Sequence, residues 1–448
     1  MKYNLFLWLK KCNFAHDNEK TPKVFFYCFT NYFFMDYSRC IIKPCVESEI
    51  GKLNCVLLHA PGPEIEHMTP ENAHKFLFSD MLNQREAYND YRDFEGTLRK
   101  VTTVLTVREL LEDILKNQEL KHELVEKICK RENVEFLKDE LDKLSNIDLA
   151  KAFIEGLEND SFKERYILPP APNFFFMRDA SFTMYDNIMI SKMATTVRDR
   201  ESILLQAIYN NSPIFDVKTV NPVEQYAPNG IGRVEGGDVL IARHDIILSG
   251  CGARTSEEGI KAMVEHLKTK GGHRHLISQQ LPLEPESFIH LDMVFTLLDV
   301  NKCMVFKPVI LNSKYKTVHY EIFENGEVKV YEEENLIVAL RKLGMDLEPI
   351  FCGGDDEYNM LREQWHSGSN FFTFAPGKIL GYERNYNTIE NLHRHGFEVL
   401  TAADVASGKV SVDDYKNCVV AFKGNELSRG GGGARCMTMP LHRDAVAW

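Results

Sequence analysis

The sequence lacks long hydrophobic runs, paired cysteines and an excess of basic charge. An apolar stretch near the start, residues 4–9, ends at Lys10 and Lys11 and is too short for a membrane helix. Eleven cysteines are scattered without a Cys-x-x-Cys pair, which indicates neither a disulfide framework nor a zinc site and favours a reducing cytosol. The net charge of -12 argues against a nucleic-acid or anionic-membrane partner, because both normally require a basic face.

One long segment also lacks the residues that interrupt helices. Residues 107–157 contain no proline and no glycine before Gly156. Apolar residues recur there at helical spacing, as at Leu110, Leu111, Ile114 and Leu115, while Glu and Lys fill the remaining positions. The pattern predicts several amphipathic helices in an inserted helical subdomain, assigned to residues 107–165, with its charges on a solvated face.

The rest of the chain reads as a compact α/β body over residues 46–106 and 166–448. Hydrophobic and charged contents of 44% and 26% are typical of a soluble globular protein. Short strand patterns, as at residues 54–60 and 181–185, alternate with helical patterns, as at residues 84–98 and 257–269. Two short strands, a loop and a helix recur at intervals of about 50–80 residues, which predicts a quasi-symmetric array of units around an axis.

Residues 1–45 form an N-terminal extension that is rich in aromatic residues but has no clear period. We expect it to be disordered or an artefact of the assigned start, with Met35 as the alternative start. A weak amphipathic anchor is the competing interpretation.

Near the C-terminus, four glycines at residues 430–433 precede Cys436. Consecutive glycines do not support a stable helix or central strand, so this run predicts a loop that is mobile or approaches other groups closely. Cationic neighbours favour a thiolate, and Arg435 and Arg443 stand near Cys436 in the sequence. The segment therefore suggests a presented nucleophile, although a lone cysteine is more often a small buried hydrophobe.

Three other short motifs offer partners for such a thiol. His290 and Asp292 are two residues apart, so in an extended segment both side chains face one cavity. Glu235 and Asp238 flank two glycines, where a backbone or ligand can approach closely. Asp179 follows an arginine after an aromatic run. Each motif alone has an ordinary structural explanation, as a rim residue, a turn or a surface ion pair.

Together the motifs resemble the arginine deiminase family. The resemblance rests on Asn-(x)5-Asp at 173–179, Glu-Gly-Gly-Asp at 235–238, His-x-Asp at 290–292 and the glycine-rich segment with Cys-Met-Thr-Met-Pro at 436–440. It extends from about residue 46 to the end of the chain. It implies the pentein fold, a fivefold pseudo-symmetric α/β propeller of strand-strand-helix-strand modules, with the helical subdomain inserted.

The resemblance also implies an activity, the hydrolysis of free L-arginine to L-citrulline and ammonia in arginine catabolism. Cys436 would attack the guanidinium carbon and form a thiouronium intermediate, with His290 as general acid and then general base. Asp179 and Asp292 would hold the guanidinium nitrogens, and Glu235 would raise the pKa of the histidine. The resemblance implies no cofactor and no metal.

Recognition of the amino-acid end is carried over in the same way. The family's carboxylate-binding arginines match Arg198 and Arg254, and Asn173 matches a substrate-contacting position. Many relatives have a further arginine within the glycine loop, where this sequence has only glycine. Arg429 and Arg435 are the loop arginines that remain. The predicted substrate-binding residues are Asn173, Arg198, Arg254, Asp238, Arg429 and Arg435.

Several alternatives remain open from the sequence. An agmatine deiminase would have little use for Arg198 and Arg254, because its substrate lacks the carboxylate. An amidinotransferase would pass the amidino group to an amine instead of water. A catalytically silent arginine-binding protein is disfavoured by the intact catalytic residues, and a metal hydrolase by the lack of metal-ligand spacing. We expect L-arginine as the small-molecule substrate, no nucleic-acid or membrane partner, a homo-oligomer and a cytoplasmic location.

Overall fold

The computed structural model describes residues 41–158, 166–227, 231–285, 288–312 and 314–448. Residues 1–40, including Met35, lie outside the described residues, so the predictions for the extension stay predictions. Of the extension, residues 41–45 join the body: the Cys45 N–H donates to the Leu441 carbonyl at 2.9 Å. The described chain is mixed α/β, as the sequence predicted.

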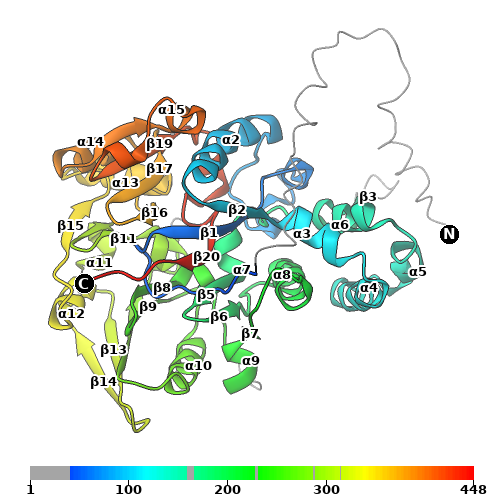
Figure 1. Ribbon diagram of the computed structural model, residues 1–448, viewed down its shortest axis with the longest axis horizontal. Helices are drawn as coiled ribbons and strands as arrows, with labels where there is room; N and C mark the ends of the chain where they lie inside the picture. The colour runs from blue at the N-terminus through cyan, green and yellow to red at the C-terminus, as the bar shows by residue number, and fades with distance from the viewer. Residues whose placement is uncertain (1–40, 159–165, 228–230, 286–287, 313) are drawn as a thin grey trace.

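Five sheets in the described part of the chain share one pattern (Figure 1). Each contains an antiparallel pair of strands, and the second strand of the pair also binds a third strand in parallel. In chain order the strand triplets are β5 (Ser181–Met184), β6 (Asn187–Ile190) and β7 (Thr219–Val220); β8 (Val239–Arg243), β9 (Ile246–Cys251) and β10 (Arg274–Gln280); β11 (Phe295–Asp299), β12 (Lys302–Val305) and β15 (Glu348–Phe351); and β16 (Phe372–Ala375), β17 (Lys378–Tyr382) and β19 (Cys418–Phe422).

The fifth triplet is built from both ends of the described chain. β20 (Met439–Arg443) pairs antiparallel with β1 (Leu53–Leu58), and β1 pairs in parallel with β2 (Thr103–Thr106). Figure 1 shows β20 and β1 side by side in the centre of the molecule. This pairing places β20, and the segment just before it, next to β1, which lies hundreds of residues earlier in the sequence.

A helix lies between the second and third strands of every triplet, because a parallel connection requires a crossover. These helices are α2 (Gln84–Val101), α8 (Asp199–Asn211), α10 (Glu257–Lys268), α12 (Leu336–Lys342) and α14 (Tyr386–Arg394). Side-chain caps define where several begin: Asn83 accepts from the Glu86 N–H in α2, and Ser256 accepts from the Gly259 N–H in α10.

Additional elements extend two of the sheets. The hairpin of β13 (Thr317–Ile322) and β14 (Val328–Glu333) lies between β12 and β15 in sequence, but β13 pairs with β10 of the preceding sheet. Figure 1 shows this hairpin extending from the lower edge of the molecule. β18 (Glu398–Thr401) pairs in parallel with β19. Further helices are α9 (Pro222–Tyr226), α11 (Lys307–Ile310), α13 (Glu357–Trp365) and α15 (Ala402–Ser407).

The proline-free segment is helical. It contains α3 (Val107–Ile114), α4 (Gln118–Glu132), α5 (Lys138–Leu141) and α6 (Asn146–Glu155), followed by the short pair β3 (Leu157–Glu158) and β4 (Tyr166–Leu168). Leu110, Leu111 and Ile114 are buried in a core that also includes Leu204 and Leu205 of α8. The apolar stripe of this segment therefore packs onto the body. The assignment of residues 107–165 as a separate insertion stays a proposal.

In the described ranges, no helix combines the length and the apolar character needed to cross a membrane.

Candidate active site

The segment that precedes the first strand of each antiparallel pair carries a polar side chain. Asp179 lies on α7 (Met177–Ala180) before β5, Asp238 on the 3-10 helix η6 (Gly236–Asp238) before β8, and Asp292 on the 3-10 helix η8 (Leu291–Met293) before β11. Asn370 precedes β16, and Cys436 precedes β20. The common sheet pattern thus delivers one functional group from each triplet.

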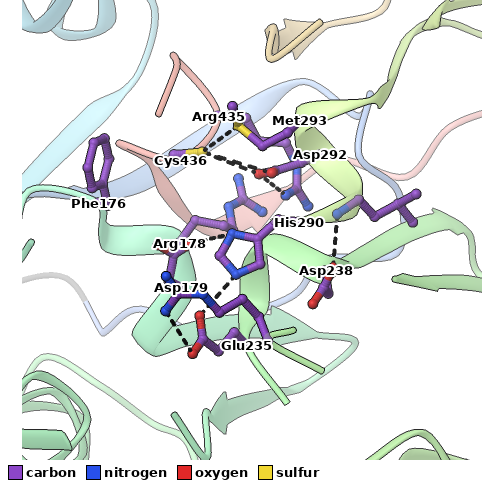
Figure 2. Close-up of polar contacts among 12 residues, drawn as sticks. Phe176, Arg178, Asp179, Glu235, Asp238, His290, Asp292, Met293, Arg435 and Cys436 are labelled. Carbon is purple, nitrogen blue, oxygen red and sulfur yellow. Dashed lines mark hydrogen bonds and ion pairs between the residues drawn. The ribbon is translucent and has the colours of Figure 1, made fainter. Parts of the chain in front are cut away.

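These segments bind one another directly. The Arg178 N–H donates to the Cys436 carbonyl at 3.0 Å, and the Leu291 N–H donates to Asp238 Oδ1 at 2.9 Å. Asn370 Nδ2 donates to the Asp292 carbonyl at 3.0 Å. Figure 2 shows Cys436 beside Asp292, with the predicted catalytic groups gathered around them. The tertiary structure therefore brings together four motifs that are far apart in sequence.

The His290 segment does not have the extended conformation that we expected. His290 itself is extended, but Asp292 lies within the 3-10 helix η8, so the two side chains do not follow strand alternation. The turn instead directs Asp292 toward Cys436, with Oδ2 3.7 Å from Sγ, while His290 faces Asp179 and Glu235. In a strand both side chains would point to the same side, whereas in this turn Asp292 faces the thiol and His290 faces the two carboxylates.

The two glycines of the Glu-Gly-Gly-Asp motif allow the close approach that the sequence suggested. A Cβ atom at Gly237 would lie 2.5 Å from His290 Nδ1 and 2.9 Å from Asp179 Oδ1. A side chain at this position would therefore displace the imidazole or the carboxylate.

His290 is held between two carboxylates. Its Nε2 lies 3.0 Å from Glu235 Oε2 and its Nδ1 lies 3.6 Å from Asp179 Oδ1. Burial alone would favour the neutral imidazole, but the charges of Asp179, Glu235 and Asp238 raise the pKa of His290 to about 9. Burial likewise opposes ionisation of Glu235, yet its partners His290 and Arg254 lower the pKa of that carboxyl to about 2. The pair is a charged imidazolium on a carboxylate at neutral pH.

Cys436 differs from the sequence-based expectation. Arg435 and Arg443 were expected to lower the pKa of the thiol, but that pKa is raised well above its ordinary value. Burial is the main cause, followed by the negative charges of Asp292 and Asp179, and these effects outweigh the charge of Arg435. Without a cationic ligand, Cys436 is therefore a neutral thiol at neutral pH.

Asn370 is a site residue that the sequence reasoning did not single out. Its Oδ1 accepts the backbone N–H groups of Arg435 at 2.9 Å and Cys436 at 3.2 Å, and its Nδ2 donates to Cys436 Sγ at 3.2 Å. The repeat offered a signal, because Asn370 stands two residues before its strand just as Asp179 does.

A pocket opens beside the thiol. The sequence-predicted residues among its lining are Cys436, His290, Asp179, Asn173, Arg198 and Arg254. Residues 430–432 of the glycine loop line it as well. A Cβ at Gly432 would lie 2.4 Å from Phe176 Cε1, so the loop approaches the aromatic run as closely as its composition suggested.

Two buried charged groups of this pocket have polar atoms without a hydrogen-bond partner among the described residues. They are Oδ1 of Asp179 and Nη1 of Arg254. Each has only a longer ion-pair contact, Oδ1 with His290 Nδ1 at 3.6 Å and Nη1 with Glu235 Oε1 at 3.8 Å. Arg198 is more fully bound, since Nη1 donates to Asp179 Oδ2 at 2.6 Å and Nη2 donates to Glu201 at 2.7 Å. Asn173 donates from Nδ2 to the Phe76 carbonyl at 2.7 Å. The pocket thus offers an anionic acceptor and a cationic donor beside one thiol.

The remaining predicted substrate-binding residues do not line the pocket. Arg435 is fully buried and donates to Asp292 Oδ2 at 2.8 Å and to Glu49 at 3.0 Å. Asp238 is buried behind η8, and burial raises its pKa to about 6. Arg429 binds Asp80 at 2.8 Å at the surface. Arg435 and Asp238 instead bind the η8 segment, Arg435 through the Asp292 carboxylate and Asp238 through the Leu291 N–H.

Known proteins match the chain over most of its length. The family model for arginine deiminase matches residues 155–443. An arginine deiminase from Oenococcus oeni is 31% identical over 432 residues, which cover 90% of this chain and 97% of the relative. The chain belongs to the arginine deiminase family. A second arginine deiminase, from Limosilactobacillus reuteri, is 32% identical and covers 89% of this chain and 98% of the relative.

Solved structures are similar at lower identity. One is the product-bound N-terminal domain of ArgZ, an arginine dihydrolase from cyanobacteria. The match covers 87% of the present chain and 97% of the ArgZ domain, with 15% identity and a TM-score of 0.49. Another is a citrulline-bound DDAH variant from Pseudomonas aeruginosa. This match covers 87% of the present chain and 99% of the DDAH chain, with 13% identity and a TM-score of 0.46.

Proposed function

We propose that this protein hydrolyses free L-arginine to L-citrulline and ammonia through a covalent intermediate on Cys436. The observation that carries the proposal is that Cys436, Asp179 and Arg254 line one pocket, and that Oδ1 of Asp179 and Nη1 of Arg254 have no hydrogen-bond partner among the described residues. L-arginine carries a guanidinium at one end and a carboxylate at the other, so it complements both groups. Membership of the arginine deiminase family supports the same reaction.

Substrate binding prepares the nucleophile. The guanidinium binds Asp179 and Asp292, the two carboxylates whose charges raise the pKa of the thiol. Its positive charge beside Cys436 favours the thiolate, so the thiol releases its proton to solvent water as the substrate binds. The carboxylates also fix the planar guanidinium, with its carbon next to Sγ.

Two chemical steps follow. The thiolate attacks the guanidinium carbon, and the tetrahedral adduct releases ammonia after its nitrogen takes a proton from His290. A thiouronium on Cys436 remains. Neutral His290 then takes a proton from water, the hydroxide adds to the same carbon, and the carbon–sulfur bond breaks to release citrulline. Glu235 holds the imidazole and stabilises its charged form.

The amino-acid end of the substrate would bind Arg254, Arg198 and Asn173. Arg254 is the better carboxylate partner, because its Nη1 lacks a hydrogen bond to any described residue, whereas Arg198 already binds Asp179 and Glu201. Arg435 would act through Asp292.

The fold, the assembly and the location belong to the same proposal. We infer that the five strand triplets form the fivefold pseudo-symmetric propeller of the pentein fold, which the shared strand pattern and the contacts among the segments of Asp179, Asp238, Asp292, Asn370 and Cys436 support. A homo-oligomer and a cytoplasmic location stay predictions.

Mass spectrometry tests the reaction directly. The protein is incubated with L-arginine or agmatine, and the small products and the acid-quenched intact chain are analysed. We expect citrulline and ammonia from arginine only, with a trapped adduct on Cys436. The Cys436→Ser variant should fold but form neither product nor adduct, while Cys251→Ser, outside the pocket, should retain both. Turnover of agmatine in place of arginine, or activity of Cys436→Ser, would contradict the proposal.

A further inference from the structure

A cluster of metal-ligating side chains lies outside the pocket, where the hairpin β13–β14 joins β10. His273, His275 and Glu321 each offer a ligand atom, and these atoms all lie within 4.8 Å of one another. None of the three residues lines the pocket beside Cys436, and the proposed reaction uses none of them.

The sheet register explains why these residues meet. β10 and β13 are antiparallel, and His275 stands directly opposite Glu321. His273 comes two residues before His275, just ahead of β10, and its Nε2 lies 3.0 Å from Glu321 Oε1. Directly opposite and diagonal neighbours on one face of an antiparallel pair are within reach of long side chains. Two imidazoles and a carboxylate, from β10, the residue before it and β13, are therefore gathered on one face.

A second layer of contacts orients the ligands. The Tyr331 hydroxyl of β14 donates to Glu321 Oε2 at 3.0 Å, which leaves Oε1 toward His273. His275 Nδ1 lies 3.0 Å from His319 Nε2, and His319 Nδ1 lies 3.7 Å from Glu333. Metal-binding histidines and carboxylates commonly have such outer partners, which fix the ring tautomer and the orientation of the ligand.

We propose that His273, His275 and Glu321 bind a zinc ion. Two imidazole nitrogens and one carboxylate oxygen are a common ligand set for Zn²⁺, with water in the fourth position. At bond lengths of about 2.0–2.2 Å, tetrahedral ligand atoms are about 3.3–3.5 Å apart, which is close to the 3.0 Å between His273 and Glu321. His275 binds through Nε2, because its Nδ1 faces His319.

The ion would join the hairpin to the sheet of the preceding unit. β13 and β14 come from the segment between β12 and β15, yet β13 pairs with β10. A ligand that binds only the folded arrangement stabilises it to an extent that grows with the ratio of its concentration to Kd. Zinc should therefore raise the melting temperature without entering the reaction at Cys436.

The alternative is that His273 and Glu321 form an ordinary hydrogen-bonded pair without an ion. A titration separates the two. The full-length protein is treated with a chelator, dialysed and titrated with Zn²⁺ by calorimetry, and with Co²⁺ by absorption spectroscopy. We expect one saturable site, visible d–d bands typical of tetrahedral Co²⁺, and a higher melting temperature in zinc.

Variants locate the site. His273→Ala and Glu321→Gln should each weaken Zn²⁺ binding at least tenfold and abolish the Co²⁺ bands. His273 is half exposed, so its removal is not expected to prevent folding. His244→Ala removes an exposed histidine outside the cluster and should change neither the Zn²⁺ affinity nor the Co²⁺ bands. Zinc binding of equal strength in all these proteins, or the absence of saturable binding, would overturn the proposal.

Discussion

Both polar atoms of the Asn370 side-chain amide bind Cys436. Its Oδ1 accepts the Cys436 backbone N–H at 3.2 Å, and its Nδ2 donates to Cys436 Sγ at 3.2 Å. The same amide oxygen also accepts the Arg435 N–H at 2.9 Å. One side chain from the turn before β16 therefore fixes both the backbone and the sulfur of Cys436, the proposed nucleophile. A donor beside the sulfur also favours its negatively charged form.

Asn370→Ala should therefore lower kcat more than it raises KM. Loss of the amide leaves two buried N–H groups without a partner, at a cost of about 1–3 kcal/mol each. If one such cost falls on the transition state, the rate should drop roughly five- to 150-fold. Steady-state citrulline formation measures the effect. Asn391→Ala is the matched control, because Asn391 on α14 donates to the Phe351 carbonyl. An equal loss of activity in both variants would show that Asn370 has only a structural role.

The His290 pair predicts a pH dependence of stability. The pKa of His290 is raised from 6.5 to about 9 in the folded protein. Its contribution to the free energy of unfolding is therefore complete below pH 6.5 and is lost as the pH rises through about 9. The contribution amounts to about 3 kcal/mol, since a tenfold change in proton affinity corresponds to about 1.4 kcal/mol. Urea unfolding at pH 6, 7.5 and 9 should show a steeper decline for the native chain than for His290→Gln. Parallel declines would contradict the assignment.

Turnover should depend on the same group. In the proposed mechanism the first step requires protonated His290, so kcat/KM, which reports the free protein, should fall as the pH rises through about 9. A kcat/KM that keeps rising with pH beyond this point would exclude His290 as the general acid.

The raised pKa of the Cys436 thiol predicts slow alkylation of the free protein. Iodoacetamide reacts with thiolates, so labelling should be slow at pH 7 and should accelerate with pH. Asp292→Asn removes one of the charges that raise this pKa and should therefore speed labelling at pH 7. Mass spectrometry of labelled peptides reports the rates, with Cys251 in the same sample as the control. Fast labelling of native Cys436 at a rate that does not depend on pH would contradict the prediction.

Arg254→Ala should raise the KM for arginine at least tenfold, because a charge-assisted hydrogen bond to the carboxylate contributes about 1.5–3 kcal/mol. Any slow agmatine hydrolysis should change much less, since agmatine has no carboxylate. Arg254→Lys keeps the positive charge near Glu235, and Arg243→Ala removes an arginine that binds Asp245 instead. Equal effects of Arg254→Ala on both substrates would show that Arg254 acts through Glu235.

Much of the fold and of the candidate site was predictable from local patterns. The helical spacing of Leu110, Leu111 and Ile114 identified a buried face because the period of a helix is written in the sequence. The glycines beside Glu235 and the glycines before Cys436 indicated close approach because only glycine leaves that space. The four motifs identified the family because their residue types and their order are both specific.

Only the tertiary structure decided how these groups act on one another. The sequence placed Arg435 next to Cys436, yet Arg435 binds Glu49 and Asp292, and the charges that dominate the thiol are those of Asp292 and Asp179. Asn370 gained its importance because the turn before β16 lies against the turn before β20, although 66 residues separate it from Cys436. Sequence neighbours determine local conformation, but burial and Coulomb interactions depend on distance in space, and that distance is set by the assembled sheets.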